Sequence, residues 1–214
     1  MKKIIALICL LSSVSLFAQE KKDALKSYRA GRDFEVAGNM TEAKAKFQES
    51  VDICRAELQE NSRNIESYVV ITWSLIRLQD YRETVRLCNE ALKINPKEYR
   101  IIETLGEAYF YLDNYTESLK NFENYLAGLP NGDRSSVAMF FMAEIYRLQG
   151  RHAHADIAYC AALYKEPGNS LWWYRLGRVR ENANDKAGAK SAYERALRLR
   201  PNYPDAQEAV KRVS

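Results

Sequence analysis

The chain has 214 residues, 47% of them hydrophobic and 28% charged, a composition typical of a soluble protein that buries a core. With only 9 Gly and 5 Pro, it is not a low-complexity or disordered chain. The formal net charge is +4, and it falls to +2 (30 basic and 28 acidic residues) if Lys2 and Lys3 leave with a leader. So small a net charge does not indicate nucleic-acid binding, and no nucleic-acid partner is expected.

The segment 1–18 has the pattern of a secretory signal peptide. Two lysines precede an apolar run from Ile4 to Leu11, and small or apolar residues continue to Ala18. Cleavage after Ala18 would leave residues 19–214 as the mature chain. A structural N-terminal helix is the alternative, but such a helix would be apolar on every face. No later stretch approaches the roughly 20 apolar residues of a membrane span, so we expect an exported, periplasmic or otherwise extracytoplasmic protein that is not integral to a membrane.

Three cysteines remain in the mature chain, namely Cys54, Cys88 and Cys160. An odd number cannot form a closed disulfide framework. Each lies among apolar residues, which favours small buried side chains. A disulfide between Cys54 and Cys88 is the alternative.

The last part of the chain carries a regular spacing of large and small residues. Its members are Trp173, Leu176, Gly177, Ala189, Tyr193, Ala196 and Pro201. The spacing resembles the tetratricopeptide repeat (TPR), a helix–turn–helix unit of about 34 residues with the pattern W-x2-L-G-x2-Y…A-x3-F…P. Arg180 stands where that family has Tyr. The resemblance implies an all-α fold, a right-handed α-solenoid of five such units.

Prolines give the register of the earlier units. Pro96 and Pro130 are separated by one repeat length, and so are Pro167 and Pro201. The distance from Pro130 to Pro167 is three positions longer, so an insertion lies within the turn-forming stretch 131–136. The expected repeats span about 24–57, 65–98, 99–132, 136–169 and 170–203, with a capping helix over 204–214. Seven extra residues, 58–64, are expected to lengthen the second helix of the first unit and the loop after it.

Each unit is expected to close its core only against the next one. A small residue on the first helix, such as Gly106, lets the paired helices approach, and an aromatic residue such as Phe122 fills the space. In the second unit Thr72 replaces this glycine and Cys88 replaces the aromatic residue.

Few residues point to catalysis or metal binding. His152 and His154 form an isolated His-x-His, which indicates a solvated turn more than a zinc or copper site. Glu103 and Glu107 lie one turn apart, and a solvated helix face is favoured over a specific role. No phosphate loop or nucleophile motif is present. We expect neither an enzyme nor a cofactor or metal.

In proteins of this family the first helix of each unit lines a concave groove. The resemblance places these residues at the groove positions: Tyr28, Arg32, Val69, Trp73, Ile76, Arg77, Glu103, Glu107, Phe110, Tyr111, Phe140, Glu144, Arg147, Tyr174 and Arg178, with Glu35, Glu66, Arg100 and Asn182 at further ones. Exposed aromatic residues mixed with charges are typical of a recognition surface. Burial of some of these side chains by the curvature of the solenoid is the alternative.

Two adjacent first helices should bring Trp73 beside Phe110 and Tyr111. The subclass that grips the C-terminal carboxylate of cytosolic chaperones is excluded, because its Lys and Asn are replaced here by Tyr28 and Arg32. Residues 171–214 hold 10 basic and 5 acidic residues, which indicates either a solvated face or an anionic contact at this end.

Together these features predict an exported, non-enzymatic TPR scaffold that binds a protein or peptide partner through its groove in a bacterial cell envelope. A solute- or lipid-binding solenoid that serves an envelope transporter is the alternative, motivated by Val69, Trp73, Ile76 and Phe140.

Overall fold

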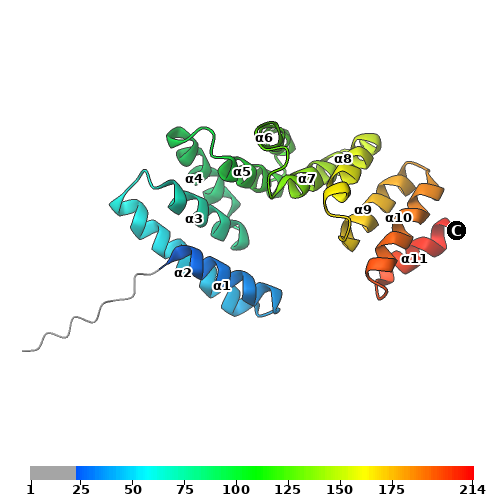
Figure 1. Cartoon of the computed structure of the whole chain (residues 1–214), viewed down its shortest axis with the longest axis horizontal. Helices are drawn as coiled ribbons and strands as arrows, with labels where there is room; N and C mark the ends of the chain where they lie inside the picture. Colours follow the sequence, from blue (N-terminus) through cyan, green and yellow to red (C-terminus); the bar gives the residue numbers. More distant parts are fainter. Residues whose placement is uncertain (1–22) are drawn as a thin grey trace, which may run out of the picture.

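The computed structural model describes residues 23–214, which form an arch of eleven helices with no strand in that range (Figure 1). The N-terminal helices form one arm of the arch, and the helices nearest the C-terminus form the other. The expected signal peptide and its cleavage site lie outside the described residues. The all-α solenoid predicted from the sequence is confirmed.

Ten helices pair into five consecutive units, and an eleventh follows them. The first helices of the units are α1 (Ala24–Val36), α3 (Ile65–Arg77), α5 (Tyr99–Tyr111), α7 (Ser135–Leu148) and α9 (Ser170–Asn182). The second helices are α2 (Met40–Glu60), α4 (Tyr81–Ile94), α6 (Tyr115–Gly128), α8 (His152–Lys165) and α10 (Lys186–Leu199), and the last helix is α11 (Pro204–Val213). At 21 residues α2 is the longest, so the extra residues do lengthen this helix.

The turn inside every unit has the same backbone conformation. Two positions before each second helix, one residue takes a positive φ: Gly38 (81°), Gln79 (64°), Asp113 (56°), Gly150 (70°) and Asn184 (63°). This left-handed residue ends the first helix. In three units the residue just before the second helix caps it, because Asp80, Asn114 and Asp185 accept hydrogen bonds from backbone N–H groups three residues on. The turn of each unit is therefore set by local backbone conformation and, in three units, by a capping side chain.

Within a unit, the two helices touch where a small residue faces a large one. A Cβ atom added to Gly177 would lie 2.5 Å from the ring of Tyr193, closer than packed atoms allow. The same pairing occurs between Gly31 and Phe47, and between Gly106 and Phe122. In the second unit Thr72 and Cys88 are both fully buried, so a larger side chain on the first helix is matched by a smaller one on the second.

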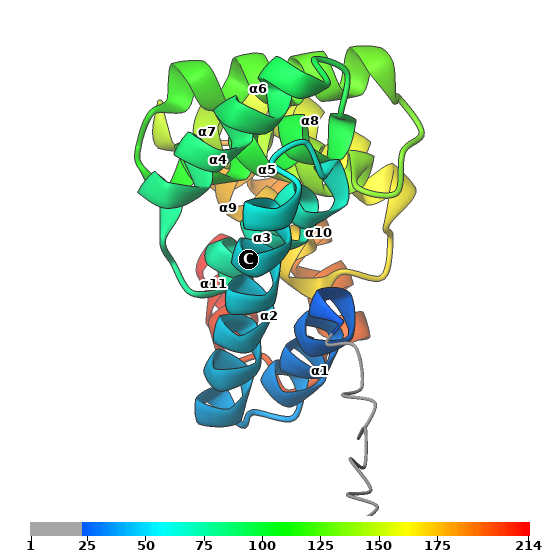
Figure 2. The ribbon, with the colours of Figure 1, turned by 90° about the vertical axis from the view of Figure 1, so that its left-hand side faces the viewer.

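Neighbouring units share continuous hydrophobic packing. One buried cluster joins α1 to α5, a second joins α5 to α7, and a third joins α7 to α10. Consecutive first helices contact one another from α1 to α7, whereas α6 and α8 lie on the outer side of the arch (Figures 1 and 2). The first helices of these units therefore face the inner, concave side.

The cysteines differ in their surroundings. Cys54 and Cys88 are buried and unbonded, and burial raises the pKa of the Cys54 thiol to about 12. Cys160 is exposed, so the expectation of a buried side chain is wrong there: it lies beside the charged side chains of Asp156 and Arg180. In the part of the chain that the structure describes, no helix is both long and apolar enough to cross a bilayer.

Candidate functional site

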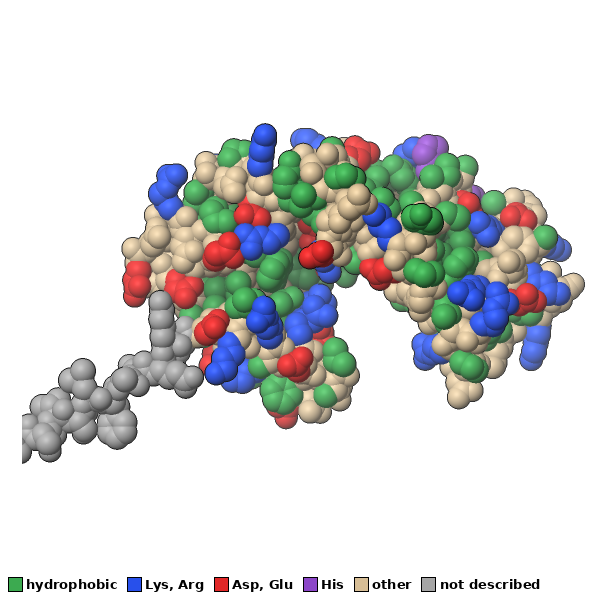
Figure 3. Space-filling view, viewed as in Figure 1, with side chains coloured by type: hydrophobic (Ala, Val, Ile, Leu, Met, Phe, Trp, Pro, Cys, Tyr) green, Lys and Arg blue, Asp and Glu red, His purple; other side chains and the backbone are tan. Residues whose placement is uncertain are grey.

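The inner side of the arch contains a cavity of about 490 Å³, open to the concave face, between α1, α3, α5 and the segment that follows α6. Figure 3 shows the arch hollowed between its two arms. We call the cavity of about 490 Å³ between these helices the groove cavity. Its lining residues are Tyr28 and Arg32 from α1; Trp73, Ile76 and Arg77 from α3; Arg100, Glu103, Thr104 and Glu107 from α5; and Tyr125, Leu129, Gly132, Asp133 and Arg134 from the end of α6 and the segment after it.

An apolar wall forms one side of the groove cavity. The rings of Tyr28 and Trp73 lie 5.6 Å apart between centroids, although α1 and α3 belong to different units. Ile76 is nearly buried beside them, and Trp73 is only partly covered. The structure thus brings together three of the residues that the sequence assigned to the groove.

Two arginines lie next to this wall and share one carboxylate. The Arg32 Nε lies 3.0 Å from a Glu35 oxygen, and the Arg77 Nη1 lies 3.9 Å from the same oxygen. The Arg32–Glu35 contact is an ion pair whose geometry does not fit a hydrogen bond, and among the described residues neither Nε–H has an aligned acceptor, although both Nε atoms are buried. Two guanidinium groups therefore meet a single carboxylate at this end.

The acidic pair Glu103 and Glu107 is buried, contrary to the expected solvated helix face. Arg134 donates to Glu103 over 2.8 and 3.0 Å and to Glu107 over 2.9 Å. Burial raises the pKa of Glu103 to about 7, against the opposing effect of the Arg134 charge. The correction has a physical cause: the segment after α6 folds over α5 and removes this face from water.

Arg134 itself was missed by reasoning from the sequence. It belongs to the connecting segment 129–134, which contains the inserted residues, and its backbone N–H donates to the Tyr125 hydroxyl over 3.2 Å. Leu129, Gly132 and Asp133 from the same segment also line the groove cavity. The longer spacing of the prolines around this segment located the insertion, but its path across the concave face depends on tertiary contacts.

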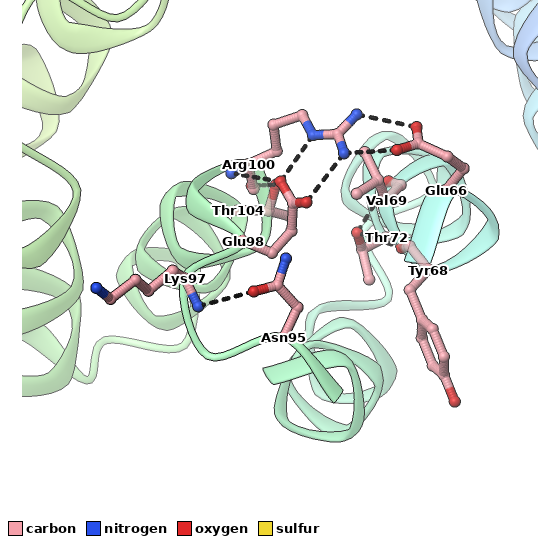
Figure 4. A network of polar contacts seen from close by, with 9 residues as sticks. All are labelled: Glu66, Tyr68, Val69, Thr72, Asn95, Lys97, Glu98, Arg100 and Thr104. Atoms are coloured by element: carbon pink, nitrogen blue, oxygen red, sulfur yellow. Dashed lines mark hydrogen bonds and ion pairs between the residues drawn. The ribbon is translucent and has the colours of Figure 1, made fainter. Parts of the chain in front are cut away.

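A network of polar contacts fixes α5 against α3 at the rim of the cavity (Figure 4). The Arg100 guanidinium donates to Glu66 over 2.7 and 2.9 Å and to Glu98 over 2.7 and 3.0 Å. These hydrogen bonds lower the pKa of Glu66. Thr104 and Thr72 turn their hydroxyls back to their own helices. Arg100 is therefore fully engaged within the protein.

Three other predicted groove residues lie elsewhere. Val69 is fully buried in the core between the first two units. Phe110 packs edge-on to Phe141 at 5.0 Å, and Tyr111 stacks on Tyr81 at 4.7 Å. None of the three lines the groove cavity, and the expected contact of Phe110 and Tyr111 with Trp73 is replaced by contacts with α4 and α7. Because each unit is rotated relative to the next, these positions lie at the contacts between units.

The fourth unit has a third buried carboxylate, that of Glu144. Glu144 accepts a hydrogen bond from Arg147 over 2.7 Å and another from the Tyr159 hydroxyl, and the Arg175 Nε lies 3.8 Å away. Phe140 stacks on Trp172 at 5.0 Å and joins the core there. These residues connect units and lie apart from the groove cavity.

The remaining predictions concern the C-terminal end. Tyr174 packs against Tyr203 and Tyr193, whereas Arg178 is exposed. Part of the basic excess is neutralised, because Arg180 pairs with Asp156 and Arg212 pairs with Glu181, each at 2.6 Å. His154 lies 5.4 Å from the ring of Tyr146. The described residues contain no group of three side chains placed to hold a metal ion.

The fifth unit, residues 170–203, matches the sequence profile of the tetratricopeptide repeat. The chain is 25% identical over 144 residues to the BBSome complex member BBS4 of Bos taurus, a match that covers 67% of this chain and 26% of that protein. The chain thus matches about a quarter of that relative's length.

Several solved TPR structures share the fold. MamA from Desulfovibrio magneticus RS-1 is 18% identical, with a TM-score of 0.61 and coverage of 84% of this chain and 96% of that one. TTC0263 from Thermus thermophilus is 16% identical, with a TM-score of 0.65 and coverage of 89% and 98%. YrrB, described as a TPR protein with an unusual peptide-binding site, is 15% identical, with a TM-score of 0.60 and coverage of 91% and 95%. With its repeated turns, its small-to-large helix contacts and its matching fifth unit, the chain has the tetratricopeptide repeat fold that its sequence predicted.

Proposed function

We propose that this protein is a non-enzymatic scaffold that binds a segment of a partner protein in its concave groove. The observation that carries the proposal is the groove cavity, in which a partly uncovered Trp73 lies between aromatic and basic side chains. Aromatic and arginine side chains at the centre of a concave surface are the groups that most often dominate binding energy. The peptide-binding site named for YrrB supports the same use of the fold.

Replacement of Trp73 by alanine tests this proposal. We expect Trp73→Ala to weaken partner binding by about 2 kcal/mol or more, roughly thirty-fold, since a buried aromatic anchor is lost. Its melting temperature should fall less than that of a core truncation, which costs roughly 3–5 kcal/mol. Binding is measured on the partner recovered by proximity labelling in the native host, with Tyr164→Ala as control, because Tyr164 is 89% exposed on α8. Unchanged labelling, or a melting curve that collapses as for a core variant, would remove Trp73 from the site.

The setting we propose is the envelope of a bacterium, reached by export through residues 1–18. Support comes only from the leader pattern of the sequence. Intact mass measurement of the protein from the extracytoplasmic fraction tests this, with the expected loss of the segment that ends at Ala18. Recovery of the full-length chain from the cytoplasm would contradict it.

An anionic contact at the C-terminal end belongs to the same proposal, and weaker binding at high salt would support it.

A solute- or lipid-binding role remains a second candidate, favoured by one observation. The volume of the groove cavity lies in the range of roughly 300–1,000 Å³ that small-molecule sites occupy. Of the four residues that motivated this role, however, Val69 and Phe140 belong to the core, and only Trp73 and Ile76 line the cavity. Native mass spectrometry of the purified protein distinguishes the two roles. A ligand that co-purifies with the wild type and is lost in Trp73→Ala would favour the small-molecule role.

A further inference from the structure

We propose that the groove cavity selects a partner segment in which an internal acidic side chain lies next to a large apolar one. The carboxylate would bind between Arg32 and Arg77, and the apolar side chain would pack against Tyr28 and Trp73. This inference rests on the proposed function and adds the chemistry of the partner.

Arg32 and Arg77 have hydrogen-bonding capacity that no acceptor in the described chain meets. Within that part of the chain, Glu35 is the one carboxylate at ion-pair distance from the two guanidinium groups, at 3.0 Å from Arg32 and 3.9 Å from Arg77. The Nε–H of each is buried and donates to no group in the described chain. Charge-assisted hydrogen bonds from an arginine to a carboxylate are stronger than hydrogen bonds between neutral groups. The Arg32 and Arg77 side chains keep 39% and 26% of their surface exposed and line the groove cavity, so an added carboxylate can reach them there.

The other cations of the cavity are already paired. The Arg100 guanidinium donates to both Glu66 and Glu98, and Arg134 donates to both Glu103 and Glu107. Each thus has two carboxylates at ion-pair distance, whereas Arg32 and Arg77 together have one among the described residues. Electrostatic complementarity locates an added carboxylate at the α1–α3 side of the cavity.

The apolar wall lies beside the proposed position of the carboxylate. The uncharged side chain of Tyr28 packs its ring against Trp73, and its hydroxyl is 3.4 Å from the Arg32 Nη1. The apolar wall and the arginine pair thus share residues of α1 and α3. A segment with adjacent apolar and acidic side chains can reach both, because neighbouring side chains of an extended chain are only a few ångströms apart.

The acidic residues of the cavity favour a carboxylate over a phosphate group as the added anion. Glu103, Glu107 and Asp133 also line the groove cavity. A dianionic phosphate would be repelled by them more strongly than a carboxylate with a single charge. Further along the groove Arg175 has a third buried Nε without a partner in the described chain, near Glu144. A partner segment that runs along the first helices extends beyond the groove cavity towards Arg175. The acidic residue bound in the cavity therefore lies within the segment and not at its end.

A peptide selection tests the inference on the mature protein. The probe is a library of random twelve-residue peptides displayed through their C-termini, so that only side-chain carboxylates are presented. Selection is run on the wild type, on Arg32→Gln/Arg77→Gln, on Trp73→Ala, and on the matched control Arg29→Gln/Arg82→Gln, whose arginines are exposed on α1 and α4. Circular dichroism melts establish that each variant is folded.

We expect wild type and control to enrich Asp or Glu beside a large apolar residue. Synthetic peptides, amidated at the C-terminus, should lose at least tenfold in affinity to Arg32→Gln/Arg77→Gln. Changing the peptide Glu to Gln should cause a similar loss, and the two losses should not add, as expected for groups in direct contact.

Other outcomes overturn the inference in distinguishable ways. Enriched peptides that lack an acidic preference, but fail to bind Trp73→Ala, would refute the acidic segment and leave the proposed function standing. Each synthetic peptide is also made with a free C-terminal carboxylate, and binding by that form alone would refute the internal position. No enrichment over background, or enrichment indifferent to Trp73→Ala, would refute both the inference and the proposed function.

Discussion

At the scale of single residues, Glu103 shows how the fold changes the chemistry of a side chain. It is almost completely buried, faces Arg134 and Glu107, and has Arg77 within electrostatic range. Burial raises its pKa from the ordinary 4.5 to about 7. Because the folded protein then holds a proton that the unfolded chain releases, this residue favours the folded state below pH 4.5 and loses that contribution as the pH rises to about 7.

The first prediction follows from this linkage. Relative to Glu103→Gln, which cannot ionise, the wild type should lose unfolding free energy between about pH 5 and pH 8. The measurement is urea unfolding of both proteins across this range. Glu123→Gln, an exposed change on α6, serves as the control and should follow the wild type. Parallel curves for wild type and Glu103→Gln would show that Glu103 ionises with an ordinary pKa.

At the scale of helices, each unit depends on a close approach between its two members. Gly177 lies against the ring of Tyr193, whose side chain is fully buried and cannot swing away. The hydroxyl of Tyr193 donates to Glu181 over 2.6 Å, which holds the ring in place. A side chain at position 177 must therefore push the helices apart.

The second prediction is that Gly177→Ala destabilises the protein by about 1–3 kcal/mol through overpacking. The matched control is Gly168→Ala, because a Cβ atom at Gly168 meets nothing within 4 Å. Thermal unfolding followed by circular dichroism measures both. An unchanged melting temperature for Gly177→Ala would mean that α9 and α10 can separate at little cost.

At the scale of the whole molecule, the units are coupled through their neighbours. The terminal helix α11 covers the last unit, with Ala206 and Ala209 fully buried. Arg212 on α11 pairs with Glu181 on α9, and this hydrogen bonding lowers the pKa of Glu181 to about 2. Contacts of this kind hold each end of the solenoid without reaching the other end.

The third prediction tests this locality. Ala209→Glu places a carboxylate in the packed interface between α11 and α10, and should loosen the fifth unit. Hydrogen exchange should accelerate in α9 to α11 and remain slow in α1 to α4, because stability is a sum of nearest-neighbour terms. Gln207→Glu, exposed on the same helix, is the control. Uniform acceleration along the chain would show that the solenoid unfolds as one cooperative body.

The sequence alone predicted the helices and their pairing, because the signals for them are local. The closing prolines and the exchange of small and large residues between Thr72 and Cys88 each act within one unit. Such signals can therefore be recognised in the sequence without knowledge of the tertiary structure.

The face of each groove residue depended on the tertiary structure instead. Val69 and Trp73 lie one helical turn apart on α3, yet one is core and the other lines the groove cavity, because the rotation between units decides which position meets a neighbour. Glu103 became buried only when Arg134 crossed α5, a contact between residues 31 positions apart. The path of an inserted segment and the pitch of a solenoid are sums over many contacts, and no short pattern in the chain encodes them.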